Sequence, residues 1–582
     1  MTKNTRAIHA VKDHKPIIIV VFILSFLVAL KTIFVSFNVD EEYQITMGYR
    51  LIRGDRLFVD IWDPHQTSAF LTEALMWVFH AIFRTYTRVV IWLRIWGNLI
   101  HLLAAYSIYR VIKDYLDPEY AFYLAALYFN LLPKNSILPD FSIMFVWSLT
   151  FLLVSLCYLL RDEKIIYAFI AGIWMCLAVL SYPSALLIFP VVLLVFVLFS
   201  KHRTKDIVVF SATSAVGGGI YLLYVLSITG SLSAFLGLIH DMLQGQGSHS
   251  DLTAAYKLSH YAKEFFVALL LCCGYLLVSK AILFVVGRIR QKKVEQVHVL
   301  VFAIVIGELH HILHWLLDLT TYEGVYNYSL YFLILSAALY YVRKTDESFG
   351  KIAIIWILLC FVELICVLIL TDLTVFTSVK YMTPAVVIGL GVIVKYADAD
   401  VSKTDSFVSR LLLVIVCMTA IFVKGWQCPV SGGYLSNITD VGGIIKQGPG
   451  TGVFTEYMNS YIARCTGEEM EQLVPDGTSL LVVDNSSIPY MYRDVTVSSY
   501  TTICYPSYNE VLLKYWDNHP EKYPDVIAVT CWYGELKWDP DSWIMKWIEN
   551  DYNAEKVIEG KYYRYYFRSK DEAPEYRETD SQ

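Results

Sequence analysis

Repeated apolar segments, each about 20 residues long, constrain the fold of this chain more than any other feature of its sequence. Across 582 residues, 56% are apolar and only 17% are charged, whereas soluble domains carry about a quarter charged residues. A soluble fold could not bury this much apolar surface, so we expect lipid to be the solvent for most of the chain. The net charge of −6 argues against nucleic acid as a partner.

Thirteen apolar segments are predicted to cross the membrane as helices. They are 17–36, 89–111, 119–133, 138–160, 165–181, 183–200, 206–228, 264–287, 297–317, 326–342, 351–371, 382–395 and 410–424. A further apolar segment, 69–83, is interpreted as a helix in the membrane interface, because a fourteenth span would invert every later loop. The first segment is expected to remain as an anchor, since no small-residue cleavage site accompanies it.

The basic residues of the short loops predict the orientation, because cytoplasmic loops are enriched in Lys and Arg. With the N-terminus inside, only Lys134 and Lys380 remain in the short outer loops. We therefore expect a multi-pass protein of the cell (plasma) membrane with a cytoplasmic N-terminus. The transmembrane domain covers 1–424, with two long outer loops at 37–88 and 229–263. Long non-helical loops in compact proteins are usually functional.

The remaining segment, 425–582, is predicted to be an extracytoplasmic α/β domain. Short apolar, β-branched runs occur at 479–483, 495–498, 525–530 and 562–567, and amphipathic stretches at 507–518 and 541–549 lie between the later ones. This pattern indicates a small parallel or mixed sheet. Disulfides among Cys428, Cys465, Cys504 and Cys531 are left open, and the absence of any CxxC pair argues against zinc.

Three consecutive carboxylates, Asp40, Glu41 and Glu42, follow the first span directly. A partly desolvated carboxylate at a membrane surface can have a raised pKa and act as a general base. The alternative is a group of solvated charges at the interface. The same loop carries further polar residues in an apolar setting, among them Arg50, Arg53 and His65, and this favours a functional role.

Asp140 and Lys380, which are also predicted at the outer face, can each be interpreted as functional or as purely structural residues. Asp140 begins the fourth span, where it would act either as a functional carboxylate or only as a helix N-cap. Lys380, followed by Tyr381, begins the twelfth span. A lysine there can snorkel, but cations are scarce in the short outer loops, so this one predicts an anionic group nearby, with phosphate as the natural candidate.

Taken together, these residues resemble motifs of bacterial GT-C fold glycosyltransferases, both in the first outer loop and in later spans, specifically those of the mannosyltransferase-like and aminoarabinose-transferase-like membrane enzymes. The motifs that carry the resemblance are Asp40-Glu41, Gly48-Tyr49-Arg50, Arg53-Gly54-Asp55, Asp63-Pro64-His65-Gln66-Thr67, Arg94, Leu138-Pro139-Asp140 before Phe145 and Trp147, and Lys380-Tyr381 before Pro384. The resemblance covers about residues 1–160 well and 161–400 by topology and one short motif.

The resemblance implies an inverting transferase that takes a sugar from a polyprenyl-phosphate donor and passes it to an acceptor hydroxyl at the outer face. The acceptor would be a lipid, glycan, wall polymer or protein of the cell envelope. By the same match, Asp40 is the first choice for the general base, Glu41 the second, and Asp140 a supporting carboxylate. Substrate contacts would come from Lys380, Tyr381, Arg50, Arg53 and His65.

Several departures from the family pattern leave details open. Asp63-Pro64-His65 replaces a motif that often reads x-P-P, and Lys380 replaces an arginine and so loses bidentate phosphate geometry. No cofactor is clearly required, and a divalent metal remains an open expectation. Two other functions also remain open: a transporter or flippase of lipid-linked saccharides, and a non-catalytic envelope assembly protein. Transporters keep polar groups near the bilayer midplane and often show repeated halves, and neither feature is evident in the sequence.

Overall fold

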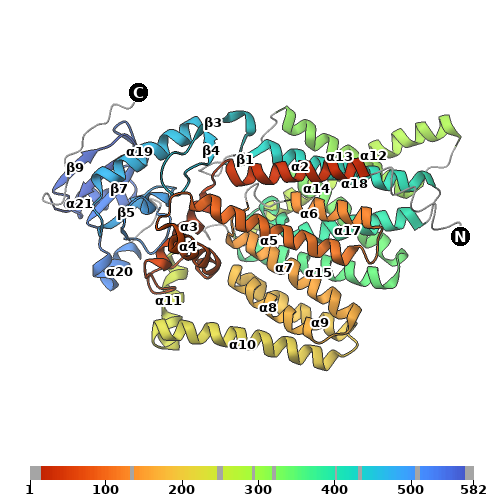
Figure 1. Ribbon diagram of the computed structural model, residues 1–582, viewed down its shortest axis with the longest axis horizontal. Helices are drawn as coiled ribbons and strands as arrows, with labels where there is room; N and C mark the ends of the chain where they lie inside the picture. The colour runs from red at the N-terminus through yellow and green to blue at the C-terminus, as the bar shows by residue number, and fades with distance from the viewer. Residues whose placement is uncertain are drawn as a thin grey trace.

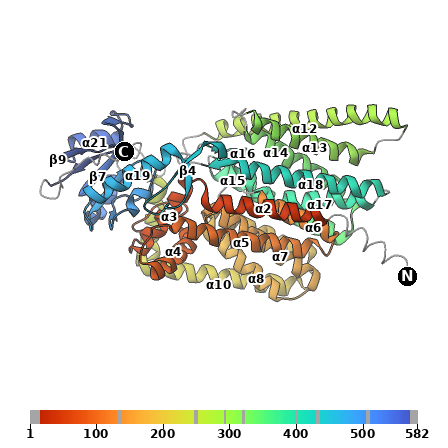
Figure 2. The ribbon, with the colours of Figure 1, turned by 45° about the horizontal axis from the view of Figure 1, so that its top comes forward.

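The computed structural model describes residues 15–131, 137–245, 253–291, 295–317, 323–371, 373–399, 403–429, 435–504 and 511–569. Lys134 and the basic residues before Lys15 lie outside these ranges. A bundle of long helices forms one part of the molecule, and an α/β region packs against one end of it (Figure 1). The start of α2 (Lys15–Phe34) lies at the opposite end, and a view turned by 45° shows the same arrangement (Figure 2).

Nine helical segments among the described residues are long and apolar enough to cross a membrane. They are contributed by α2, α5 (Val89–Ile112), α7 (Phe141–Asp162), α10 (Arg203–Thr229), α12 (Ala254–Arg290), α13 (Gln296–Leu316), α15 (Glu347–Leu370), α17 (Thr383–Ala399) with the turn before it, and α18 (Lys403–Trp426). The other four predicted spans are also helical, as α6 (Pro118–Asn130), α8 (Ile166–Ser181), α9 (Ile188–Phe199) and α14 (Glu323–Tyr341). Every predicted span is therefore a helix, and the total of thirteen crossings stays a prediction.

The helices differ in how far they are enclosed by protein. In α7, 89% of the apolar stretch is buried, whereas in α10 only 6% is buried. The exposed side of α10 carries large apolar side chains such as Val216 and Leu223, which are 63% and 70% exposed. An apolar surface of this kind is stable against lipid and unstable against water. The central position of α7 matters for the site, because this helix begins at Asp140.

The predicted outer loop 37–88 is largely helical. It contains α3 (Val39–Ile52), a 3₁₀ turn at Gln66–Ser68 (η1) and α4 (Ala69–Phe83), which matches the helix predicted at 69–83. Helix α3 begins with a capping box: Asn38 accepts a hydrogen bond from the Asp40 amide at 2.8 Å, and Glu41 accepts one from the Asn38 amide at 3.2 Å. The acidic run is thus the first turn of a helix, where the helix dipole favours negative charge.

The predicted long outer loop at 229–263 is wrong for most of its described residues. Helix α10 continues to Thr229, α11 covers Leu232–Gly245, and α12 begins at Ala254. Apolar residues of α11 at positions 235, 238, 239 and 242 follow a helical period. They pack against Leu57 and Phe58, which belong to the predicted outer loop at 37–88, hereafter the first outer segment. This burial stabilises a helix in place of the loop. Residues 246–252 lie outside the described part of the chain.

The α/β region is built on a mixed sheet with strand order β6-β5-β7-β10-β9, and a short strand, β8, also pairs with β7. The strands are β5 (Ser479–Val483), β6 (Thr496–Val497), β7 (Val526–Trp532), β8 (Glu535–Leu536), β9 (Lys556–Glu559) and β10 (Tyr563–Phe567). Strand β5 runs parallel to β6 and β7, whereas β10 is antiparallel to β7 and β9. The four predicted strands and the mixed sheet are confirmed, with shifts of a few residues at their ends.

Helices cover both faces of this sheet, which explains the continuous apolar run of β5. Leu481 and Val483 face a core shared with α20 (Val511–Asn518) and α21 (Trp543–Asn550). Leu480 and Val482 face the opposite core, shared with α19 (Tyr457–Leu473). Two hairpins, β1 (Gln427–Pro429) with β2 (Leu435–Asn437) and β3 (Val441–Ile444) with β4 (Phe454–Glu456), precede α19. The four cysteines of the region are buried free thiols.

The first outer segment joins the two parts of the molecule. The Ser36 amide donates to the Phe454 carbonyl at 2.6 Å, and the Trp62 amide donates to the Tyr500 carbonyl at 2.9 Å. Trp62 is fully buried and belongs to the same apolar core as α20 and α21. Asp63 accepts hydrogen bonds from the amide and hydroxyl of Thr502, at 3.0 and 2.6 Å. The sheet therefore sits directly on the helices that carry the predicted site.

Candidate functional site

The second carboxylate of the acidic run, Glu41, is committed to an ion pair. Arg94 of α5 donates to both of its carboxylate oxygens, at 2.8 and 2.6 Å, and both side chains are buried. Arg94 also donates to the carbonyl of Ser36 at 2.6 Å. Arg94, a motif residue in the second predicted span, therefore faces the protein interior. Both oxygens of Glu41, the second choice for the base, are thus occupied by one guanidinium.

The third carboxylate, Glu42, faces the α/β region. It is 4% exposed, and one of its oxygens accepts a short hydrogen bond from the hydroxyl of Ser486, which follows β5. Asp40 remains only half-buried in the first turn of α3. Successive helical residues point about 100° apart, so the three carboxylates have different surroundings despite being adjacent in the sequence.

Asp140 is the N-cap of α7 and is fully buried. One carboxylate oxygen accepts hydrogen bonds from the Ile143 amide and the Ser142 hydroxyl, each at 2.8 Å. The capping role considered from the sequence is therefore present. Both bonds are accepted by the same carboxylate oxygen, Oδ1.

A chain of hydrogen bonds connects α3 to the segment before Asp140. The Gln44 amide donates to the Thr72 hydroxyl at 3.2 Å, and that hydroxyl donates to the Pro139 carbonyl at 2.9 Å. Gln44 lies one helical turn after Asp40, hence on the same face of α3. The side of α3 that carries Asp40 is thereby fixed against the start of α7.

Aromatic rings bring three of the predicted site residues together. The His65 ring stacks on Phe141, the neighbour of Asp140, with centroids 4.0 Å apart and planes at 3°. Tyr182, after α8, lies 4.9 Å from His65 and 5.8 Å from Tyr381, measured between ring centroids. Tyr381 belongs to a 3₁₀ turn, Val379–Met382 (η5), before α17. His65, Phe141 and Tyr381, which are far apart in the sequence, thus surround Tyr182, and Asp140 adjoins this aromatic group through its neighbour Phe141.

Lys380 and Glu363 lie on the same side of the molecule as this aromatic group. Lys380 is half-buried, with its ammonium nitrogen 5.4 Å from the centroid of the Tyr381 ring. Glu363 of α15 is fully buried and accepts a hydrogen bond from the Ser184 hydroxyl at 2.7 Å. Its other oxygen has no hydrogen-bond partner among the described residues. Sequence reasoning missed Glu363, although a single carboxylate inside an apolar span is itself a functional signal.

The two arginines expected to contact substrate lie elsewhere. Arg50 is buried and donates to the Asp55 carboxylate at 2.7 Å and to the carbonyls of Asp60 and Ser499 at 2.8 Å. Burial alone would lower the pKa of Arg50, but the adjacent Asp55 raises it overall, so this residue stays charged. Arg53 pairs with Asp494 of the α/β region. Both arginines join the two parts of the molecule, and neither is placed beside His65 or Tyr381.

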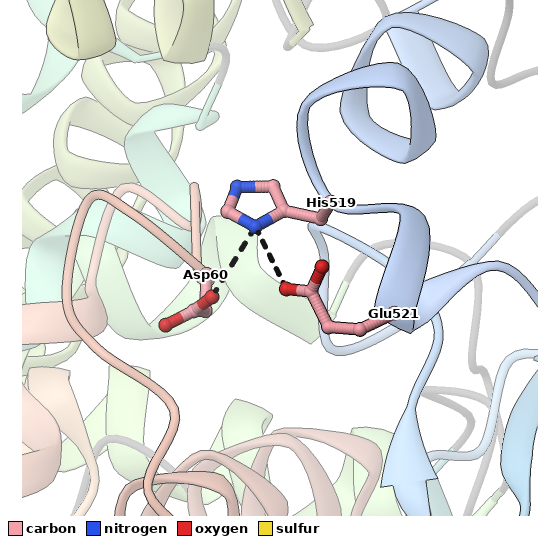
Figure 3. A group of neighbouring side chains, drawn as sticks. All are labelled: Asp60, His519 and Glu521. Atoms are coloured by element: carbon pink, nitrogen blue, oxygen red, sulfur yellow. Dashed lines mark hydrogen bonds and ion pairs between the residues drawn. The ribbon is translucent and has the colours of Figure 1, made fainter.

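One group of side chains among the described residues has metal-ligand character: Asp60, His519 and Glu521 (Figure 3). The Nδ1 atom of His519 lies 3.7 Å from Asp60 and 3.3 Å from Glu521. A divalent metal prefers such donors, but Arg56 already donates to Asp60 at 2.9 Å. Burial acts to raise the pKa of Asp60, and the bonds from Arg56 and the charge of Lys522 lower it overall. A metal here would compete with two cations, Arg56 and Lys522.

Comparison with known proteins gives a distant structural likeness. No family model and no curated protein matches the chain. Among solved structures, the chain is similar to the apo form of the Archaeoglobus fulgidus oligosaccharyltransferase, with 12% identity and a TM-score of 0.42 over 89% of this chain and 70% of that one. It is also similar to that enzyme's complex with Zn and sulfate, with 14% identity and a TM-score of 0.46 over 88% and 68%. At TM-scores below 0.5, this likeness assigns neither a family nor an activity to the chain.

Proposed function

We propose that this chain is a membrane glycosyltransferase that moves a sugar from a polyprenyl-phosphate donor to an acceptor hydroxyl, with inversion at the anomeric carbon. One observation carries the proposal: His65, Tyr381 and Phe141, the residue after Asp140, come from distant segments and meet around Tyr182 where the apolar helices end beside α3. A donor with an apolar tail and a polar head matches this transition from apolar helices to polar and aromatic groups.

Asp40 is the proposed general base. Of the three adjacent carboxylates, Glu41 and Glu42 are buried, whereas Asp40 is half-buried, so Asp40 is the most accessible to an acceptor hydroxyl. It would remove the proton of the acceptor hydroxyl as that oxygen attacks the anomeric carbon. The bond from that carbon to the phosphate oxygen breaks, and the leaving group departs as polyprenyl phosphate.

Lys380, with Tyr381 beside it, is the proposed contact for the leaving phosphate, because a fixed cation stabilises the negative charge that develops there. Asp140 is a supporting residue: it caps α7 and fixes the position of Phe141, on which His65 stacks. The acceptor is proposed to approach from the extracytoplasmic side, where the α/β region covers α3. It would be a lipid, glycan, wall polymer or protein.

The direct test is to incubate the purified protein with a panel of polyprenyl-phosphate sugars and to measure donor consumption. Asp40→Asn is expected to reduce transfer by about 10²- to 10⁴-fold, the usual contribution of a general base, with unchanged folding. The matched control is Asp541→Asn, an exposed carboxylate of the α/β region, which is expected to transfer at the wild-type rate. Wild-type transfer by Asp40→Asn would reject the base, and no consumption of any donor would reject the activity.

Translocation of lipid-linked saccharides is the second candidate, favoured by one observation. Glu308 of α13 and Glu363 of α15 are buried within membrane-spanning segments, and carboxylates at such positions often mark transport pathways. If the chain is a transporter, vesicles containing it will move a labelled lipid-linked sugar between leaflets without releasing polyprenyl phosphate. Release of polyprenyl phosphate with a glycosylated acceptor supports the transferase.

A further inference from the structure

A cavity of about 210 Å³ lies between the start of α3 and the sheet of the α/β region. Its polar lining includes Glu42, Asp484, Asn485, Ser486, Lys537 and Tyr562. Glu42 is the only one of these contributed by the helical part of the chain, and Phe37 adds an apolar wall from the same side. The cavity therefore exists only where the two parts of the molecule meet, two residues away from Asp40.

The sheet supplies the polar end of the cavity. Asp484 directly follows β5, which lies between the parallel strands β6 and β7, and ligands of α/β sheets bind at such carboxyl ends. Asp484 is 2% exposed and is fixed by the Tyr563 hydroxyl at 2.5 Å and the Asn485 amide at 2.6 Å. These contacts make the cavity wall rigid before any ligand enters.

The side chain of Asn485 is the feature that points to a ligand. Its carbonyl oxygen is buried and has no hydrogen-bond partner among the described residues. An unpartnered buried oxygen is unfavourable, and a hydroxyl donor from a ligand would satisfy it. Ser486, the next residue, is already used by Glu42. The cavity thus offers an open acceptor beside two fixed carboxylates.

The charges select the kind of ligand. Glu42 and Asp484 outnumber the one lysine, Lys537, so phosphate or a uronic acid would be repelled. Hydroxyl groups suit carboxylates and amides, and the aromatic walls from Tyr492 and Tyr562 suit the apolar face of a sugar ring. We propose that this cavity binds one neutral, hydroxyl-rich sugar residue of the acceptor, a step that rests on the proposed glycosyl transfer.

The test uses the full chain in detergent and ligand-observed saturation-transfer NMR. The probes are the methyl glycosides of glucose, mannose, galactose and N-acetylglucosamine, with glucuronate as the charged comparison. We expect at least one neutral glycoside to bind at least tenfold more tightly than glucuronate. Asn485→Leu, which keeps a similar volume but removes the amide, is expected to weaken that binding at least tenfold. The matched control is Asn518→Leu, exposed on α20, which is expected to bind like the wild type.

The possible results distinguish failure of the proposed sugar site from failure of the proposed transferase activity. Glycoside binding that Asn485→Leu removes supports the site even if no donor in the panel is consumed. Donor consumption by a wild-type protein that binds none of the neutral glycosides would overturn the site and leave the transferase intact. Tighter binding of glucuronate, or unchanged binding by Asn485→Leu, would also overturn it.

Discussion

At the scale of single residues, the acidic run shows what the sequence can and cannot predict. Three adjacent carboxylates at the end of a span predicted either a general base or solvated charges at the interface, and two of them, Glu41 and Glu42, are buried. Their separate partners could not be predicted, because Arg94 is 53 residues from Glu41 and Ser486 is 444 residues from Glu42. Arg50 was predicted to contact substrate, but its guanidinium donors are used within the protein, and their partners include Ser499, far along the chain.

The ion pair between Glu41 and Arg94 gives a test at this scale. Removing one partner leaves an uncompensated buried charge, so Arg94→Leu is expected to lower the free energy of unfolding by about 3–5 kcal/mol. Replacing both residues by leucine is expected to cost less than the sum of the two single changes. Thermal unfolding of the purified variants checks this. If Glu41→Gln leaves the melting temperature unchanged and abolishes donor consumption, Glu41 is the base after all.

The raised pKa of Glu469 in α19 predicts that the stability of the protein depends on pH. Its carboxylate accepts bonds from the amides of Lys561, Tyr562 and Tyr563, yet burial outweighs these bonds and raises its pKa from 4.5 to about 7. Between these pH values the folded state binds more protons than the unfolded state. The free energy of unfolding therefore falls as the pH rises through this window, by at most ~3 kcal/mol.

The measurement for Glu469 is the apparent melting temperature, followed by tryptophan fluorescence from pH 4.5 to 7.5. It is expected to fall across this range in the wild type. Glu469→Gln cannot ionise, so its melting temperature is expected to change less over the same range. A melting temperature that rises with pH in the wild type, and not in Glu469→Gln, would reverse the sign and contradict the assignment.

At the scale of elements, hydrophobic periodicity predicted the spans and strands well and failed at the two outer loops. The signal for α3 was present, because Asn38-Val39-Asp40-Glu41 has the spacing of a capping box. It was outweighed by the low apolar content of the segment. The helix at α11 had a visible period, but its stabilising partners, Leu57 and Phe58, come from a distant segment. Local sequence patterns predict an element only where the residues that pack against it are also close in the sequence.

Close packing between α5 and the segment before α7 provides a prediction for these elements. A Cβ atom added at Gly97 would lie 1.8 Å from the backbone carbonyl oxygen of Ile137, three residues before Asp140. Gly97→Ala must therefore displace this segment, and donor consumption is expected to fall at least tenfold. Alanine in a helix interior is otherwise favoured over glycine by about 1 kcal/mol, so propensity alone predicts no loss.

The matched control for Gly97 is Gly218→Ala in α10, where nothing lies within 4 Å of the added Cβ atom. This variant is expected to keep the wild-type rate and a melting temperature at least as high. Equal activity of the two variants would show that the position of Asp140 does not matter for transfer.

At the scale of the whole molecule, the first outer segment acts as the joint between the helices and the α/β region. The sequence predicted both parts, because each has its own pattern of apolar residues. It could not predict that Asp60, Asp63 and Arg50 would hold the parts together, since their partners lie more than 400 residues away. Polar residues in a loop therefore indicated a functional surface, and many of them stabilise an interface.

The orientation of the whole molecule across the membrane can be tested by labelling its two ends. Helix α7 runs from Asp140, near the α/β region, through 22 residues to Asp162, a rise of about 33 Å that spans the bilayer. Lys164 therefore lies at the opposite end from the α/β region, and the basic loops predict that its end is cytoplasmic. The background for labelling is Cys273→Ser, which removes the exposed native thiol.

In this background, Asp541→Cys and Lys164→Cys place one exposed thiol at each end of the molecule. A membrane-impermeant maleimide applied to intact cells is expected to label Asp541→Cys at once and Lys164→Cys only after permeabilisation. The two variants control for each other, because both must react after permeabilisation. The reverse pattern would place the α/β region in the cytoplasm. The proposed base and sugar cavity would then face the cytosol, and the acceptor would have to be sought there.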